Sequence, residues 1–347
     1  MSRHSEAVAA ALPPVTPAPA AQLAEPSAPK ASKKRPRVLL FVQVILTLAA
    51  FGYLFHISDI SALARNFKAA SPWTFPAAML VLTCVMFAGT LRWSFLMKSY
   101  GATSTPPIGH LFRLQLIGLF YNMMPGAVGG DVLRGVVSRH AFGPQGISAG
   151  LTVVVVERVF GLLALMLLVV SVLAFHPVRG LQLAPWMFVL GLLASVGALV
   201  GIAVARRLAP HLPAFLAKRA AELPELARPS MFVVALLMSL TNQVLVGLMG
   251  HLTVRPLAPQ VGMLDSLVFS PLAFAAVFVP LTVAGAGTRD SLMVALYGLL
   301  GVTKDQALLA SLEILAAYVL MAAIGGGLSL VTPLQLTDKA VSAPVNA

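Results

Sequence analysis

The sequence predicts an all-α polytopic membrane protein with about six full transmembrane helices and two re-entrant helical hairpins. Three observations predict this fold class. The 347-residue chain is 58% hydrophobic and only 10% charged, whereas soluble domains carry about 25% charged residues. Its apolar residues gather in runs long enough to cross a bilayer core of about 30 Å as helices. Two further apolar segments are interrupted by proline and glycine.

The two ends of the chain differ from its apolar middle. Residues 1–37 are rich in Ala and Pro and end in KASKKRPR, so we expect a disordered basic tail without a core. The next run, 38–57, is about as long as a full span, whereas the apolar part of a signal peptide is about 7–15 residues. We therefore expect an uncleaved first span, a transmembrane domain over 38–331 and a short C-terminal tail over 332–347.

Five more apolar runs are long enough to cross the membrane as helices. They are 73–97, 147–175, 186–205, 231–253 and 306–331. With six crossings and the N-terminus in the cytoplasm, most Lys and Arg of the loops face the cytoplasm, as the positive-inside rule requires. Both termini are then cytoplasmic. The net charge of +12 therefore reflects topology and anionic lipid, and we expect no nucleic-acid partner.

Two apolar segments do not fit a simple span. The segment 111–124 is short and runs into FYNMMPGAVGGDVLRG, and 263–300 is interrupted by FVPLTVAGAGTRD. Non-helical backbone at membrane depth is tolerated only where protein or a water-filled cavity covers it. We therefore expect two re-entrant hairpins that enter from opposite sides. The residues expected to break the helices are Pro125, Gly126, Gly129 and Gly130 in the first hairpin and Pro280, Gly285 and Gly287 in the second.

Opposed broken elements are typical of inverted-repeat transporters. The two hairpin sequences echo each other only loosely, since Pro125 leads to Asp131 through glycines and Pro280 leads to Asp290 in the same way. The echo leaves open whether the two halves form an inverted repeat.

Charged residues in or beside the apolar segments are expensive, and they usually face a cavity and pair with one another. Asp131 and Arg134 are three residues apart and share a helix face. One hypothesis is a positively biased cavity for an anionic head group, in which arginines bind phosphate oxygens and acids hold the arginines or meet a cationic substituent. The arginines are Arg134, Arg158 and Arg289, and the acids are Asp131, Glu157, Asp290 and Glu313.

The alternative is that these charges form buried ion pairs that fix helix packing and bind nothing. Arg92 lies near the cytoplasmic end of its span, so we expect it to extend to the membrane surface. A single Cys84 and isolated histidines give no metal-ligand spacing. No nucleophile–base pair stands out, and GAGTRD lacks the strand that precedes a dinucleotide site. We predict no catalytic residue, no metal and no cofactor.

Three blocks of the chain resemble the transmembrane domain of the lysylphosphatidylglycerol synthases, a flippase-like family. The blocks are GLFYNMMPGAVGGDVLRGVVSRHAFG, VVVVERVFGLLAL and VPLTVAGAGTRDSLMVALYGLLGVTKDQAL. The resemblance covers about 38–331. It implies functional roles for the motif residues, including Asn122. The third block has Asp290 where the family usually has Glu, and the shorter side chain keeps the charge but reaches less far.

The resemblance implies a short form of this family without the soluble aminoacyltransferase domain, so we expect no enzyme activity. It implies a bacterial cytoplasmic (inner) membrane protein. The first functional hypothesis is a lipid translocase that moves a phospholipid or lipid-linked head group between leaflets. The second is a non-transporting accessory protein that presents a lipid to a separate lipid-modifying enzyme. The expected ligand is an anionic or aminoacylated phospholipid or a lipid-linked intermediate.

Overall fold

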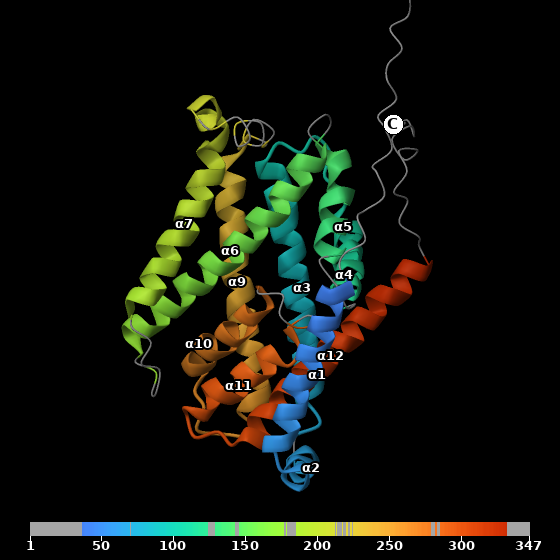
Figure 1. Ribbon diagram of the computed structural model, residues 1–347, viewed down its shortest axis with the longest axis vertical. Helices are drawn as coiled ribbons and strands as arrows, with labels where there is room; N and C mark the ends of the chain where they lie inside the picture. Colours follow the sequence, from blue (N-terminus) through green and yellow to red (C-terminus); the bar gives the residue numbers. More distant parts are fainter. Residues whose placement is uncertain are drawn as a thin grey trace, which may run out of the picture. The chain divides into compact units, whose positions relative to one another are not determined.

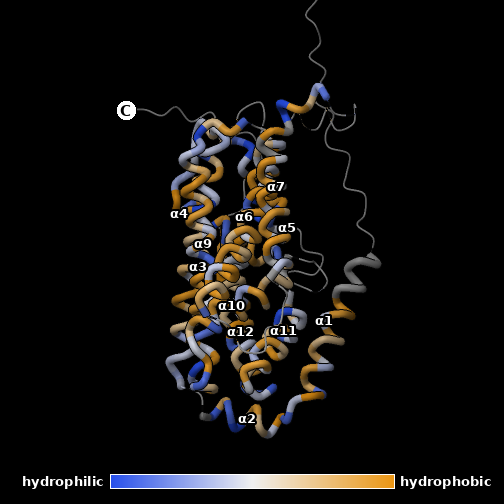
Figure 2. Tube along the Cα trace, turned by 90° about the vertical axis from the view of Figure 1, so that its left-hand side faces the viewer, coloured by the Kyte–Doolittle hydropathy of each residue, from blue (hydrophilic) through white to orange (hydrophobic). Residues whose placement is uncertain are grey.

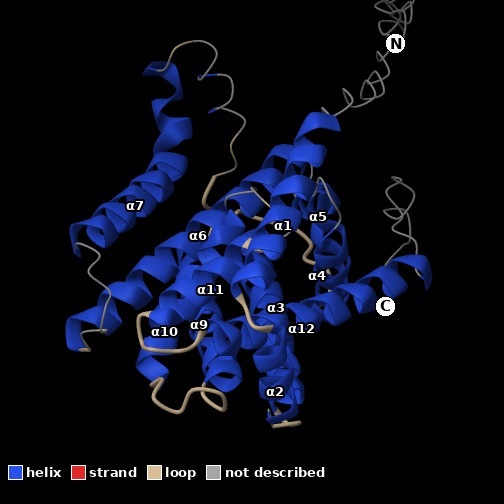
Figure 3. Ribbon diagram, turned by 60° about the horizontal axis from the view of Figure 1, so that its bottom comes forward, coloured by secondary structure: helices blue, strands red, loops and turns tan. Residues whose placement is uncertain are grey.

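Among the residues that the structure describes, all regular structure is helical and no strand occurs (Figure 3). The structure is a computed structural model of the 347-residue chain. It describes residues 37–69, 71–123, 129–142, 146–176, 178, 185–211, 213, 217, 220, 223, 225–278, 282 and 285–331. Residues 1–36 of the tail expected at 1–37 and the whole tail expected at 332–347 lie outside the described residues, and Arg37 is the first residue of a helix. The chain divides into two compact units, Met1–Arg37 and Val38–Ala347, and every described residue after Arg37 belongs to the second.

Long helices occupy all six positions where the sequence predicts spans (Figure 1). They are α1 (Arg37–Ile57), α3 (Thr74–Ser99), α6 (Gly146–Phe175), α7 (Pro185–Leu208), α9 (Pro229–Val254) and α12 (Lys304–Val331). Each predicted boundary lies within three residues of the observed one. The apolar runs therefore located these helices, because a long run of apolar side chains can be covered only by lipid or by other helices.

Four of these helices, α3, α6, α9 and α12, are long and apolar enough to cross a membrane individually. A fifth span arises if α1 and the following helix α2 (Ile60–Ala69), which meet at 85°, count as one broken span. Helix α7 is not among these spans, because its apolar part, Val189–Gly201, is shorter. The 3-10 turn η3 (Ala209–His211) follows α7. Among the described residues the structure thus supports four or five spans by length and composition, where the sequence predicts six.

Helix α2 is amphipathic. Ile60, Leu63 and Phe67 lie on one face at helical spacing, and Arg65 and Lys68 lie on the other. The apolar face is uncovered in part, since Ile60 is 69% exposed and Phe67 is 71% exposed. Figure 2 shows both hydrophilic and hydrophobic residues along the short helix α2. An amphipathic helix bent away from a span is typical of a helix that lies in the membrane interface.

Two pairs of short helices stand where the sequence predicts hairpins. The first pair is α4 (Ile108–Met123) and α5 (Gly129–Val137), followed by the turn η1 (Ser138–Ala141). The second is α10 (Met263–Phe274), its extension η4 (Ala275–Phe278) and α11 (Thr288–Gly298). The two helices of each pair contact each other, and the pairs lie in opposite halves of the bundle (Figure 1). Helix α4 is the longest helix of the two pairs. At 1.5 Å per residue it is only about 24 Å long, which is less than the bilayer core of about 30 Å.

Of the residues expected to break the helices, those that the structure describes lie before the second helix of a pair or at its first residues. Gly285 and Gly287 precede α11, and both have positive φ, at 76° and 87°. Gly129 and Gly130 open α5. Pro125, Gly126 and Pro280 lie outside the described residues.

The helix contacts support an inverted repeat in which α3–α6 corresponds to α9–α12. In both halves the first helix packs on the first hairpin helix, and the second hairpin helix packs on the closing long helix. Helix α4 also contacts α12, and the equivalent helix α10 contacts α6, which is the equivalent of α12. Helices α3 and α9 pack on each other, and the Ser99 carbonyl accepts hydrogen bonds from the Ala227 and Arg228 amides. The end of α3 therefore meets the start of α9, so these equivalent helices are antiparallel.

Helix α5 approaches α4 closely at Gly130. A Cβ atom on Gly130 would lie 2.0 Å from the Gly118 carbonyl oxygen and 2.7 Å from Oδ1 of Asn122. Gly130→Ala is expected to lower the free energy of unfolding by about 1–3 kcal/mol, because the hairpin helices must separate. The measurement is thermal unfolding in detergent micelles. Gly109→Ala in α4 is the control, since nothing lies within 4 Å of that Cβ position. Equal midpoints for both variants would contradict the prediction.

Candidate functional site

Glu157 is the centre of a group of charged side chains inside the bundle. It is the twelfth of the thirty residues of α6, so it lies about 17 Å along the helix from its start. Oε1 of Glu157 is 2.6 Å from Nη2 of Arg92, and Oε2 is 2.6 Å from Nη2 of Arg134. Glu157 and Arg134 are buried, at 5% and 6% exposure. One carboxylate therefore holds two guanidinium groups from α3 and α5.

Arg92 does not extend to the membrane surface as the sequence suggested. Its side chain is 12% exposed and is bound by Glu157, and its Nη1 lies 3.4 Å from the Ser239 hydroxyl oxygen on α9. The expectation was wrong because α3 packs on both α6 and α9, and this packing brings Glu157 and Ser239 within reach of Arg92. Nothing in the local sequence of α3 distinguishes these two outcomes.

The first turn of α5 contributes Asp131 to the same group. Asp131 forms an ion pair with Arg158 of α6, and its Oδ1 is 3.9 Å from Nη1 of Arg134, as the three-residue spacing predicts. Asn122 of α4 donates from Nδ2 to Asp131 Oδ1 at 3.5 Å and accepts the Gly130 amide at 3.1 Å. Asn122 thereby ties the two hairpin helices together. We call the five charged residues the α6 cluster: Arg92, Asp131, Arg134, Glu157 and Arg158.

The α6 cluster is reachable from the side of the bundle. The Arg158 side chain is 43% exposed. On α6, Ile147, Leu151 and Val155 are also exposed, at 51%, 38% and 54%, and their four-residue spacing continues towards Arg158 along one outward face. Val132 on α5 is 41% exposed as well. A guanidinium thus lies on the apolar outer surface of a spanning helix and connects through Asp131 to the buried arginines.

Among the residues that the structure describes, the α6 cluster contains three guanidinium groups and two carboxylates. The cluster also contains buried donors without an acceptor among the described residues, namely Nε of Arg92 and Nε of Arg134. Trp93 is fully buried, its ring lies 4.5 Å from the Arg134 guanidinium carbon, and its indole N–H has no acceptor either. Buried polar groups are usually paired, so this set favours an anionic ligand.

Arg289 and Asp290 lie in a second, separate group at the start of α11. Arg289 is 3% exposed and Asp290 is fully buried. Oδ1 of Asp290 accepts hydrogen bonds from Arg289 Nη2 at 2.6 Å and from the Ser311 hydroxyl, and Oδ2 accepts the Gly287 amide at 2.8 Å. The shorter acid therefore reaches all three partners. Aromatic rings flank Arg289, with its guanidinium carbon 5.2 Å from the Phe274 ring centre and 6.0 Å from that of Tyr318. We call Arg289 and Asp290 the α11 pair.

The structure does not bring all predicted charges together in one group. Glu313 of α12 stands apart from both groups, because no described basic side chain forms an ion pair with it and its Oε1 has no hydrogen-bond partner there. No ion pair among the described residues joins the α6 cluster to the α11 pair.

The site holds no candidate metal centre, since no group of three His, Cys, Asp or Glu side chains with metal-binding geometry occurs within the part of the chain that the structure describes. The site lined by the α6 cluster is instead rich in arginine, which binds oxyanions.

Fold and site together define a polytopic α-helical membrane protein with two hairpins and intramembrane ion pairs. The chain belongs to the family of the lysylphosphatidylglycerol synthase TM region, whose model matches residues 40–326. Membership of this family relates the chain to lipid handling. This match confirms the sequence resemblance to the family over nearly all of the transmembrane domain. A comparison with curated proteins finds no match.

Proposed function

We propose that the chain translocates a phospholipid or lipid-linked head group between leaflets, with the α6 cluster as the head-group site. The observation that carries the proposal is the half-exposed Arg158 on the outer face of α6. A cation on the outer face of a long apolar helix suits a lipid, because the head group can reach the cluster while the acyl chains stay in the bilayer. A water-soluble substrate does not need a cation at such a place.

The ion pairs suggest how an anionic group is received. A phosphate that approaches Arg158 competes with Asp131 for the guanidinium, and Arg matches phosphate oxygens with two parallel hydrogen bonds. Arg134 lies 3.9 Å from Asp131, so it is the next cation that the phosphate meets. Glu157 keeps Arg134 and Arg92 in place. An aminoacylated head group would add a cationic substituent, for which Asp131 is the partner.

The inverted repeat supports transport rather than binding alone. In inverted-repeat transporters the two halves exchange conformations, and broken helices near the midplane hold the substrate. Helices α4 and α5 of one half correspond to α10 and α11 of the other. The proposal also places both termini in the cytoplasm of a bacterial inner membrane, on the grounds of the positive-inside rule.

Leaflet exchange in liposomes tests the proposal. The reconstituted protein is mixed with head-group-labelled phosphatidylglycerol, and exchange is followed by quenching of the outer label. Arg158→Ala and Arg134→Ala are expected to slow exchange at least about tenfold, because each removes charge-assisted hydrogen bonds to the head group. Arg206→Ala is the control, since Arg206 forms an exposed pair with Glu225 outside the cluster.

Wild-type exchange no faster than that of Arg158→Ala would overturn translocation. If Arg158→Ala then also loses lipid that wild type retains on purification, the accessory function that presents a lipid to a separate enzyme becomes the better explanation. Retained binding in Arg158→Ala would remove the α6 cluster as the head-group site altogether.

A further inference from the structure

A groove lies between α1 and the second hairpin, far along the chain from the α6 cluster. Its volume is about 440 Å³, within the range of about 300–1,000 Å³ for ligand pockets. Its walls come from three elements: Tyr53, Leu54 and Ile57 of α1, Ser291, Val294, Ala295 and Gly298 of α11, and Val302, Thr303 and Lys304 at the start of α12. The α11 residues follow the i, i+3, i+4, i+7 spacing of one helix face.

A close contact between α1 and the hairpin defines one end of the groove. A Cβ atom on Gly287 would lie 2.6 Å from Cβ of Ala50, so α1 touches the hairpin directly at that point. Beyond it, around Tyr53 to Ile57, the helices leave the groove between them. Tyr53 is 60% exposed, so the groove is open on the side that faces the bilayer.

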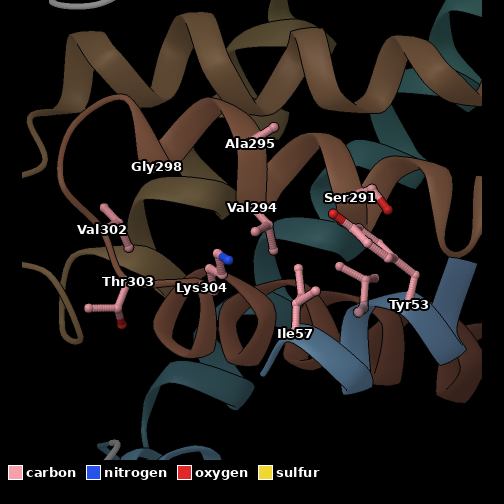
Figure 4. Close-up of a pocket in the computed structure, with 10 residues that line it drawn as sticks. Tyr53, Ile57, Ser291, Val294, Ala295, Gly298, Val302, Thr303 and Lys304 are labelled. Carbon is pink, nitrogen blue, oxygen red and sulfur yellow. The ribbon is translucent and has the colours of Figure 1, made fainter. Parts of the chain in front are cut away.

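The groove has polar ends and an apolar middle. Figure 4 shows Val302 and Thr303 at one end with Lys304 next to them, Tyr53 and Ser291 at the other end, and Ile57 and Val294 between. Lys304 forms no ion pair within the described part of the chain, and the neighbouring Asp305 accepts the Asp59 amide at 2.9 Å. The cation at the groove end is thus available to an anion.

The Lys304 end lies at the level of the amphipathic helix α2. The Asp59 amide, directly before α2, binds Asp305, directly after Lys304. Because α2 has the features of an interfacial helix, this level corresponds to the lipid head groups. The apolar part of the groove extends from there along α1, past Ile57 and Leu54 and away from the level of α2.

We infer that this groove is a second lipid site, which binds one anionic phospholipid from the leaflet on the α2 side. Lys304 binds the phosphate, and the upper part of one acyl chain lies along Ile57 and Val294. The inference does not depend on the α6 cluster. A bound lipid would fill the space between α1 and the second hairpin and so hold the two together.

Gly298 provides a direct test, because it lines the groove and nothing lies within 4 Å of its Cβ position. Gly298→Trp fills the groove without a clash at Cβ. Gly52→Trp is the matched control, since its Cβ position on α1 is equally open and Gly52 does not line the groove. The full-length protein in detergent micelles is irradiated with an equimolar diazirine-acyl phosphatidylglycerol, and labelled peptides are mapped by mass spectrometry.

Wild type and Gly52→Trp are expected to label on α1 and α11 beside the groove, and Gly298→Trp is expected to lose that labelling. Lys304→Gln should weaken it about fivefold, the effect of one basic residue on an anionic lipid. Arg158→Ala should keep it, which separates this site from the proposed transport site. Labelling that persists in Gly298→Trp, or that is equal for the corresponding phosphatidylcholine, would overturn the inference.

Discussion

Glu157→Gln is expected to lower the free energy of unfolding by about 3–5 kcal/mol and to abolish leaflet exchange. The stability loss is that of a buried ion pair from which one partner is removed. The carboxylate of Glu157 lies 2.6 Å from both Arg92 and Arg134. Glutamine keeps the shape but offers one acceptor oxygen to two cations, and its amide N–H faces a guanidinium donor. Arg92 then lacks a counter-charge, and Arg134 keeps only the longer contact of 3.9 Å to Asp131.

The measurement is the thermal unfolding midpoint of the purified protein in detergent micelles, together with the exchange rate in liposomes. Glu225→Gln is the matched control, because the same change there removes a pair whose side chains are 74% and 39% exposed. Exposed pairs contribute only about 0–1 kcal/mol. A Glu157→Gln protein as stable as Glu225→Gln would show that the α6 cluster does not fix the packing of α3, α5 and α6.

Asp290→Asn is the second change with a large expected effect, again about 3–5 kcal/mol of unfolding free energy. Asp290 is fully buried and accepts from Arg289, Ser311 and the Gly287 amide. These partners are all donors, so the amide N–H₂ of Asn meets a donor in either orientation. The loss should also loosen the turn at Gly287, whose φ of 87° is held by the hydrogen bond from its amide.

Ser311→Ala is the reference variant for this prediction, because it removes one hydrogen bond to Asp290 and leaves the Arg289 charge paired. Its expected cost is about 1 kcal/mol. Thermal unfolding of both variants in the same detergent compares them. A midpoint for Asp290→Asn no lower than that of Ser311→Ala would mean that the charge of Arg289 does not need Asp290.

The sequence by itself determined the fold class, the positions of the long helices and the two interruptions. These follow from local properties, because an apolar run of span length and a glycine or proline within it act on their own segment. The same holds for Asp131 and Arg134, whose spacing of three residues places them on one helix face. The family follows from motifs that are themselves short and local.

Only the tertiary structure decided which charges meet. Glu157 binds Arg92, 65 residues away, and Arg134, 23 residues away, because rotation and crossing of three helices aim these side chains at one point. The same packing turned Arg92 inward, separated the α11 pair from the α6 cluster and left Glu313 outside both groups. Long side chains on packed helices choose partners by geometry across the bundle, and sequence spacing carries no information on that geometry.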